Sequence, residues 1–448
     1  MTDDALARLH DVLGDRFITS DDPEYETARL PWNRAVDQRP LAVAVPHTDE
    51  EVAAVVRVAA ASGLRVAPQS TGHGAGAGAN RDLSRTILLS LADLRGVTID
   101  PVARTATVRG GTLWNEVAEA AGAHGLAAMH GSSGDVSVVG LILSGGISFY
   151  GRRHGLSVNS VRRVRLVTAQ GTIVTASVTE NPDLFWAVRG ASGRVGVVVE
   201  VEIGLLPYPD VFAGMMLWDG ARAAEVGHAW RRWTAEAPES ATTSLRVMHF
   251  PPIPELPPFL SGRSVVIIDG AILDADDDAQ ALLAPLRALQ PEIDTFARIP
   301  AARLVEMHMD PPDPTPAVSG HAGLHDFDAD AVEAFVAAAF EGRPMMSEVR
   351  HVGGAFRRPA DGGGAVSALD SDYLLYSVAA VFDPAMADAA TRATSTVVDA
   401  LAPWHGTSMA ITFCDDDRDL SPAYGAGVDR LAALTQRFDP EGVLFPAH

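Results

Sequence analysis

The chain has 448 residues, of which 47% are hydrophobic and 21% charged, which is ordinary for a globular protein that can bury a large core. The 57 acidic residues against 35 basic ones give a formal net charge of −22, which argues against a nucleic-acid or anionic-membrane partner. The single cysteine, Cys414, excludes an internal disulfide and any multi-cysteine metal site. The acidic start and the lack of a long apolar run predict neither a signal peptide nor a membrane span, so we expect a cytoplasmic protein.

The first part of the chain alternates short strands and helices. After a helix over residues 4–13 and a strand over 41–45, Thr48 and Glu51 form a capping box that predicts a helix ending near Gly63. A strand over 65–68 completes a β-α-β unit. The run over 195–206 is almost continuously apolar, which predicts a strand buried on both faces. Further strands are expected over 86–91, 96–99, 105–108, 164–168 and 172–176, and helices over 113–121 and 182–188.

Pro207-Tyr208-Pro209 marks a boundary, because beyond it the glycine-dense segments cease and longer amphipathic helices alternate with strands. We interpret this part as an antiparallel sheet with helices on one side. The tail predicts one more helix with Val428, Leu431, Leu434 and Phe438 facing inward. Expected helices cover 221–235, 276–289, 329–340 and 385–402, and expected strands cover 264–272 and 373–382.

Four glycine-dense segments carry the functional signal, at residues 69–76, 131–134, 144–146 and 189–196. Glycine lets the backbone approach a bulky ligand, and successive free N–H groups in such a loop suit a phosphate. No G-x-G-x-x-G lies directly between an expected strand and helix, and no Walker sequence occurs, so a Rossmann or P-loop site is unsupported. Several such loops together indicate an elongated cofactor that main-chain amides contact along its length.

The order and spacing of these motifs resemble the flavin-binding half of the vanillyl-alcohol-oxidase superfamily. Pro46-His47-Thr48, Gln69-Ser70-Thr71-Gly72-His73 and the run from Gly131 to Leu156 carry the resemblance, with Asp183 to Gly190. The combination is similar to the berberine-bridge-enzyme-like branch, over residues 40–207 and the last twenty-five residues. The resemblance implies an α+β fold with a two-subdomain PCMH-type FAD-binding domain over 1–209. A substrate domain over 210–402 is built on an antiparallel sheet backed by helices. A segment over 403–448 then returns to the FAD domain.

The resemblance also implies FAD as the cofactor, attached covalently through His73. Many relatives hold a second bond through a cysteine where this chain has Ser133, so we expect His73 to be the only attachment. Val136 takes the position that gates oxygen access, and a small branched residue there resembles the oxidase pattern. The residues implied to contact FAD are Gln69, Ser70, Thr71, Gly72, His73, Gly74, Ser133, Gly134, Val136, Val138, Gly140, Ser144, Gly145, Gly146, Gly196, Val198 and Tyr424.

Several positions depart from the family pattern. Gln69 stands where a basic residue is common, Arg194-Val195 replaces an Asn-Phe pair, and Gly427 replaces an asparagine. Ser137 replaces the usual glycine after Val136. We therefore prefer an oxidase but keep a dehydrogenase as an alternative. These departures affect the expected contacts more than the fold.

Alcohol or amine oxidation needs an acceptor for the substrate proton, and a tuned carboxylate, tyrosinate or histidine would serve. Our first candidate is Tyr376, on an alternating strand, followed by Tyr150 and His351; a half-buried sheet tyrosine with no catalytic role is the competing interpretation. Tyr373, His308 and Glu306 are further candidates on the expected floor of the second domain. The family's catalytic tyrosine near the glycine turn corresponds to Ile147 here.

The expected function is therefore FAD-dependent oxidation of a small alcohol, amine or hydroxylated intermediate of secondary metabolism, by hydride transfer to flavin N5 with O2 reduced to H2O2. The alternatives are a dehydrogenase with another electron acceptor and a flavoprotein that catalyses a non-redox cyclisation. His321-x-x-x-His325 could suggest a metal, but we expect a solvated loop and no metal site. The carboxylate runs at 276–278 and 415–417 are expected to be solvated faces.

Overall fold

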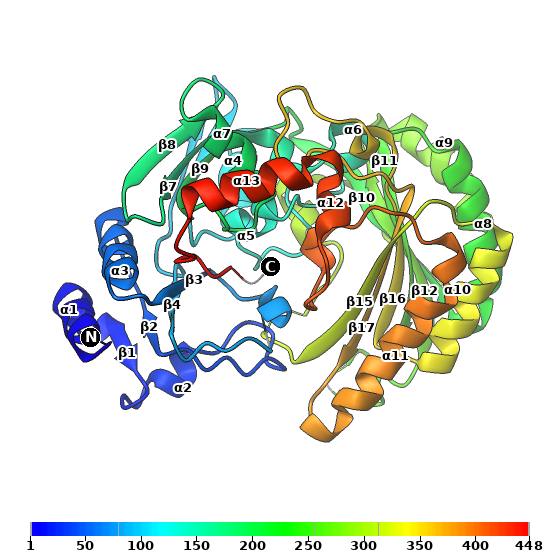
Figure 1. The fold of residues 1–448 in the computed structure, drawn as a ribbon. Coiled ribbons are helices and arrows are strands. Elements are labelled where there is room, and N and C mark those ends of the chain that lie inside the picture. The colour runs from blue at the N-terminus through cyan, green and yellow to red at the C-terminus, as the bar shows by residue number, and fades with distance from the viewer. Residues whose placement is uncertain (1, 79, 255, 312, 447–448) are drawn as a thin grey trace.

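The computed structural model describes residues 2–78, 80–254, 256–311 and 313–446, and its longer strands form three sheets (Figure 1). The sheets are successive along the chain, and the third is the largest. No helix among these residues is long and apolar enough to cross a membrane.

The first sheet has the order β1-β2-β4-β3 and holds the β-α-β unit expected from the sequence. The hydroxyl of Thr48 accepts a 3.1 Å hydrogen bond from the Glu51 N–H, as the capping box predicts. The two strands of the unit are not neighbours, because β4 lies between them and pairs in parallel with both. The elements are α1 (Thr2–Leu13), β1 (Phe17–Thr19), β2 (Ala42–Ala44), α3 (Asp49–Ala61), β3 (Arg65–Gln69) and β4 (Thr86–Ser90).

The second sheet has the order β5-β6-β9-β7-β8 and is antiparallel throughout. Burial of β9 on both faces holds only for its first half, because Glu200 and Glu202 alternate with buried residues. Glu202 pairs with Arg163 of β7 at 3.3 Å, so the second half presents a polar face. The elements are β5 (Val97–Asp100), β6 (Thr105–Arg109), α4 (Trp114–Gly122), α5 (Val138–Leu143), β7 (Val161–Val167), β8 (Ile173–Ser177), α7 (Pro182–Val188) and β9 (Val197–Gly204).

The third sheet is antiparallel and is backed by four helices on the side away from the other two sheets (Figure 1). The sequence predicted the helices and two of the strands but not β10, β11, β15 or β16. The order of the main path is β13-β10-β12-β11-β16-β17-β15. The elements are β10 (Asp210–Asp219), α8 (Ala223–Glu236), β11 (Ala241–His249), β12 (Ser264–Ile272), α9 (Asp276–Arg287), β13 (Ile293–Asp294), β14 (Ala297–Pro300), β15 (Ala317–Leu324), α10 (Ala329–Gly342), β16 (Met346–His351), β17 (Tyr373–Ala380) and α11 (Ala387–Ala400).

The last described residues return to the first two sheets. Helix α13 (Val428–Phe438) packs against α7, with Leu431 and Leu434 buried as expected. Arg430 and Arg437 of α13 each lie 3.1 Å from Asp183 at the start of α7. Residue Leu444 then bridges Val66 of β3 in parallel. The domain boundaries at residues 209 and 402 remain predictions.

Candidate functional site

The first glycine loop, residues 69–74, leaves the end of β3 and lines a cavity of about 1050 Å³. Gly72 has φ +81°, and an added Cβ would lie 2.6 Å from the Cβ of Pro31, so only glycine fits there. The Thr71 carbonyl accepts a 2.9 Å hydrogen bond from the Trp32 N–H, and the Ser70 hydroxyl donates to the Gly110 carbonyl. These contacts fix the loop, so its remaining polar backbone groups can face a ligand.

His73 lies at the centre of this loop, and three residues position its imidazole. The ring stacks on Trp32 with centroids 4.3 Å apart. Its Nδ1 lies 2.8 Å from the Thr71 hydroxyl and its Nε2 lies 3.6 Å from Asp135. The imidazole is therefore held in one orientation in the cavity wall.

Asp135 is a site residue that the sequence analysis missed. Its carboxylate accepts hydrogen bonds of 2.6 Å from both the Trp32 indole and the Ser133 hydroxyl. Burial raises the pKa of Asp135, but His73 and these hydrogen bonds outweigh it and lower the pKa below its usual value. The only sequence signal is a carboxylate inside a glycine-rich segment, next to the oxygen-gate position.

Most of the expected cofactor residues line this cavity. They are Gln69, Ser70, Thr71, Gly72, His73, Gly74, Ser133, Val136, Gly140, Ser144, Gly196 and Val198.

Five of the expected residues are absent from the cavity wall. Val138 and Tyr424 are buried in the core between the second sheet and its helices. An added Cβ at Gly146 would lie 2.5 Å from Leu141, and one at Gly145 would lie 3.4 Å from Val366. Gly134 packs against Asn115 and Val305, so these three glycines allow close packing of the chain.

The inner face of the third sheet forms the opposite wall of the cavity. Cross-strand register places Arg246 opposite Glu348 and Glu348 opposite Tyr376, so the three side chains form one row. The next row toward the β11 carboxyl end holds Met248, Met346 and Val378. The wall is therefore polar along one row and apolar along the next.

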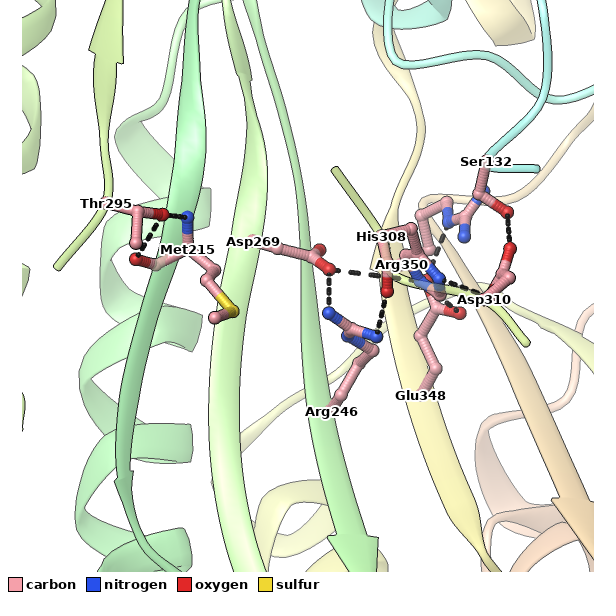
Figure 2. Close-up of polar contacts among 9 residues, drawn as sticks. All are labelled: Ser132, Met215, Arg246, Asp269, Thr295, His308, Asp310, Glu348 and Arg350. Atoms are coloured by element: carbon pink, nitrogen blue, oxygen red, sulfur yellow. Dashed lines mark hydrogen bonds and ion pairs between the residues drawn. The ribbon is translucent and has the colours of Figure 1, made fainter. Parts of the chain in front are cut away.

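Five buried charged groups and the half-buried Asp310 form what we call the polar cluster: Arg246, Asp269, His308, Asp310, Glu348 and Arg350 (Figure 2). Five of them line the cavity, and Asp269 lies behind Arg246. Arg350 donates a 2.7 Å hydrogen bond to Glu348, and Arg246 donates one of 3.0 Å to the His308 carbonyl. Asp310 also accepts a 3.1 Å hydrogen bond from Ser132, which joins the cluster to the second glycine segment.

His308 is the imidazolium of the polar cluster. Its Nδ1 lies 2.8 Å from Asp310, and its Nε2 lies 3.6 Å from Glu348. Burial and the Arg246 charge lower the pKa of His308, but Asp310 and Asp269 outweigh them and raise it to about 9. Arg350 and His308 hold the pKa of Glu348 well below its usual value against the effect of burial. The cluster therefore pairs three basic with three acidic side chains.

Tyr376 lines the cavity as expected, but burial raises its pKa well above the ordinary value. The phenol is therefore a proton donor at neutral pH, and a tyrosinate base is unsupported. Ser319 opposes the effect of burial on the Tyr376 pKa, and its hydroxyl donates a 2.6 Å hydrogen bond to Asp415. Burial raises the pKa of Asp415, a cavity residue that also packs against Gly76 beyond the first glycine loop. The prediction that residues 415–417 form a solvated face is correct for Asp416 and Asp417, which are exposed, and wrong for Asp415.

The other two catalytic candidates do not line the cavity. Tyr150 is fully buried and stacks on Tyr208. His351 is buried against Arg152, with 2.5 Å between Nε2 and Nη1, and stacks on Tyr373. Tyr150 was expected from its place near the glycine turn and His351 from the floor of the second domain, but both side chains face the protein interior.

His321 corrects the prediction of a solvated loop. It lies in β15, is buried, and its two ring nitrogens contact the Leu375 carbonyl at 2.8 Å and the Ala410 N–H at 3.1 Å. Among the residues that the structure describes, no group of three His, Cys, Asp or Glu side chains could hold a metal ion. Glu306 pairs with Arg303 near the surface.

Residues 40–177 match the family model described as "FAD binding domain". This part of the chain is an FAD-binding domain. Similarity to curated proteins also falls in less than half of the chain. (R)-6-hydroxynicotine oxidase of Paenarthrobacter nicotinovorans is 35% identical over 202 residues, 45% of this chain and 44% of that protein. Xylooligosaccharide oxidase of Thermothelomyces thermophilus is 37% identical over 187 residues, 42% of this chain and 38% of that protein.

The fold around the FAD-binding domain is berberine-bridge-enzyme-like. A berberine-bridge-enzyme-like protein of Physcomitrella patens superposes with a TM-score of 0.86 at 20% identity, covering 99% of this chain and 98% of the other. 6-Hydroxy-D-nicotine oxidase of Arthrobacter nicotinovorans superposes with a TM-score of 0.82 at 22% identity, covering 95% of each chain. The FAD-binding domain and the large antiparallel sheet therefore occur together in these solved structures.

Proposed function

We propose that the protein is an FAD-dependent oxidase of a small organic molecule, with FAD attached through His73 alone. The observation that carries the proposal is the shared cavity, whose walls are the FAD-binding domain on one side and the polar sheet face on the other. Its volume of about 1050 Å³ exceeds the range of roughly 300–1,000 Å³ typical of one small ligand. The cavity therefore suits a cofactor and a substrate together.

The first glycine loop suits FAD because residues 69–74 line the cavity, and Gly72 lets the loop pack closely on Pro31. Residues 69–74 would hold the pyrophosphate through main-chain N–H groups. When bound, FAD accepts the two electrons of the substrate and passes them to O2, which is released as H2O2. Two similar proteins are named as oxidases, which supports O2 as the electron acceptor.

A single attachment is supported by the residues around the loop. Ser133 cannot form a thioether, and its hydroxyl is engaged by Asp135. Cys414 is buried, does not line the cavity, and donates its thiol hydrogen to the Ala410 carbonyl. Burial also raises the pKa of Cys414 to about 12, so the thiolate needed for reaction is scarce.

The proton acceptor we propose is Asp415, acting through Ser319 and Tyr376. A substrate hydroxyl would donate to Tyr376 Oη, Tyr376 would donate to Ser319, and Ser319 already donates to Asp415 Oδ2. A carboxylate with a raised pKa is a stronger base than Glu348, whose pKa is lowered. Tyr376 is thus a proton carrier, which keeps it in the reaction without requiring a tyrosinate.

The test is a visible spectrum of the purified protein before and after acid precipitation, followed by peroxide measurement under air with candidate alcohols. Flavin absorbance that stays with the precipitate and peroxide formed in step with substrate oxidation support the proposal. Dye reduction without peroxide would instead identify a dehydrogenase. Substrate cyclisation without electron transfer would identify the non-redox alternative.

A further inference from the structure

The cavity wall opposite the FAD-binding domain is divided into two zones. Arg246, Glu348 and Tyr376 form the polar row, while Met248 and Met346 begin the apolar row beside it. The two rows are two residues apart along each strand, which is about 7 Å, so a ligand the size of one aromatic ring can reach from one row to the next. A ligand lying across both rows meets charges at one end and apolar side chains at the other.

The apolar zone continues to the cavity mouth. Five of the eleven methionines of the chain line the cavity, at positions 248, 309, 345, 346 and 386. Phe382 and Met386, at the mouth, are 73% and 46% exposed, so they extend the apolar surface to the solvent. Methionine is flexible and polarisable, so it adapts to varied apolar ligands.

The charges of the polar cluster are balanced. Its three cations, Arg246, His308 and Arg350, are matched by Asp269, Asp310 and Glu348. A charged ligand head would leave one buried charge uncompensated, which is costly. The His308 Nε2 has no hydrogen-bond acceptor within the described residues, although two carboxylates lie 3.6 and 3.9 Å away. An uncharged oxygen could accept that hydrogen bond at no electrostatic cost.

We propose that the substrate is an amphipathic alcohol, with its uncharged hydroxyl head at the polar row and an aryl or alkyl body along the apolar row. The inference rests on the proposed function and specifies its substrate class. It sets this site apart from one for an oligosaccharide, whose many hydroxyl groups would be left without partners against methionine and valine side chains.

The test is calorimetric titration of the FAD-loaded protein, reduced with dithionite and kept without oxygen so that no substrate is oxidised, using 4-butylbenzyl alcohol, 4-methylbenzyl alcohol, 4-butylbenzylamine, 4-butylbenzoate and xylobiose. Each buried methylene should tighten binding by up to about fourfold, from roughly 0.8 kcal/mol. The butyl alcohol should therefore bind at least tenfold more tightly than the methyl alcohol, the amine and the benzoate, and xylobiose should bind more weakly than all four. Equal binding of the amine or benzoate, insensitivity to chain length, or tighter binding of xylobiose would overturn the inference.

A matched pair of variants tests where the alkyl body of the substrate lies. Met248→Gln in the apolar row should reduce the preference for butyl over methyl by roughly fivefold, whereas Met215→Gln should leave it unchanged. Met215 lies on β10, is half-buried like Met248 and does not line the cavity. Equal effects of the two changes would contradict the placement, and thermal unfolding of each variant checks its fold. Binding heat does not require turnover, so absence of peroxide would reject the oxidase proposal alone.

Discussion

His73 Nε2 lies 3.6 Å from Asp135 Oδ2, and the same carboxylate oxygen accepts the Trp32 indole hydrogen at 2.6 Å. The imidazole is thus held between an aromatic ring and a carboxylate before any cofactor is considered. Ser133 takes the position of the cysteine that forms a second flavin bond in many relatives. Here it contributes only a hydrogen bond to the same Asp135.

Replacing the imidazole should release the flavin. His73→Ala should leave flavin in the supernatant after acid precipitation, because no other side chain at the loop can form the bond. Ser133→Ala should keep the flavin with the protein and is the matched control. A tryptic flavopeptide that contains Ser133, or covalent flavin in His73→Ala, would contradict the single attachment.

Removing the proposed base should slow flavin reduction. Asp415→Asn should lower the anaerobic reduction rate by about 10²–10⁴-fold, the range for general base catalysis. Asp417→Asn, two residues away and exposed, should leave the rate within twofold. Stopped-flow absorbance measures both rates, and equal rates in Asp415→Asn and the unchanged protein would reject the base.

The same assignment fixes the pH dependence of reduction. Because burial raises the pKa of Asp415, its carboxylate form is lost as pH falls through that raised value, and the rate should fall with it. The rate should rise with pH and then level off. Asp415→Asn should remove this acid limb, and a persisting limb would assign it to another group.

Stability should fall at alkaline pH because of His308. The folded-state pKa of about 9 lies above the ordinary 6.5, so the stabilisation is complete below about pH 6.5 and is lost as pH rises through 9. The sequence contains no lysine, so few other side chains titrate in this range. Melting temperatures of the unchanged protein should decline from pH 7 to 10 more steeply than those of His308→Gln. His124→Gln, at an exposed histidine, should keep the steep decline.

The first glycine loop should not tolerate a side chain. Gly72→Ala should sharply reduce FAD content, because its Cβ would lie 2.6 Å from Pro31 and the backbone φ is +81°. Gly442→Ala has a similar φ of +65° with nothing within 4 Å of its Cβ, so it carries only the backbone strain of about 1–2 kcal/mol. Equal flavin content in the two purified variants would show that the loop can shift.

The sequence predicted the glycine loops and most helices because their signals are local. Thr48 and Glu51 define a helix start within four residues, and Pro182 begins α7 where expected. The strands β11 and β16 were missed because charged residues interrupt their apolar pattern: Arg246 on one and Glu348 and Arg350 on the other. Arg246 pairs with Asp269 of β12, and Glu348 and Arg350 pair with each other beside His308, so their burial depends on the packing of segments far apart in the chain. Asp135 was missed for the same reason, since its partner Trp32 is a hundred residues earlier in the chain.

The parallel bridge between Val66 and Leu444 gives this protein an order of assembly. Val66 lies in β3, the strand that carries the first glycine loop, and its carbonyl accepts a 2.8 Å hydrogen bond from the Phe445 N–H. During synthesis on the ribosome, β3 cannot acquire these contacts until residues 444 and 445 have been translated. We therefore expect this loop to take up flavin only after residues 444 and 445 are in place.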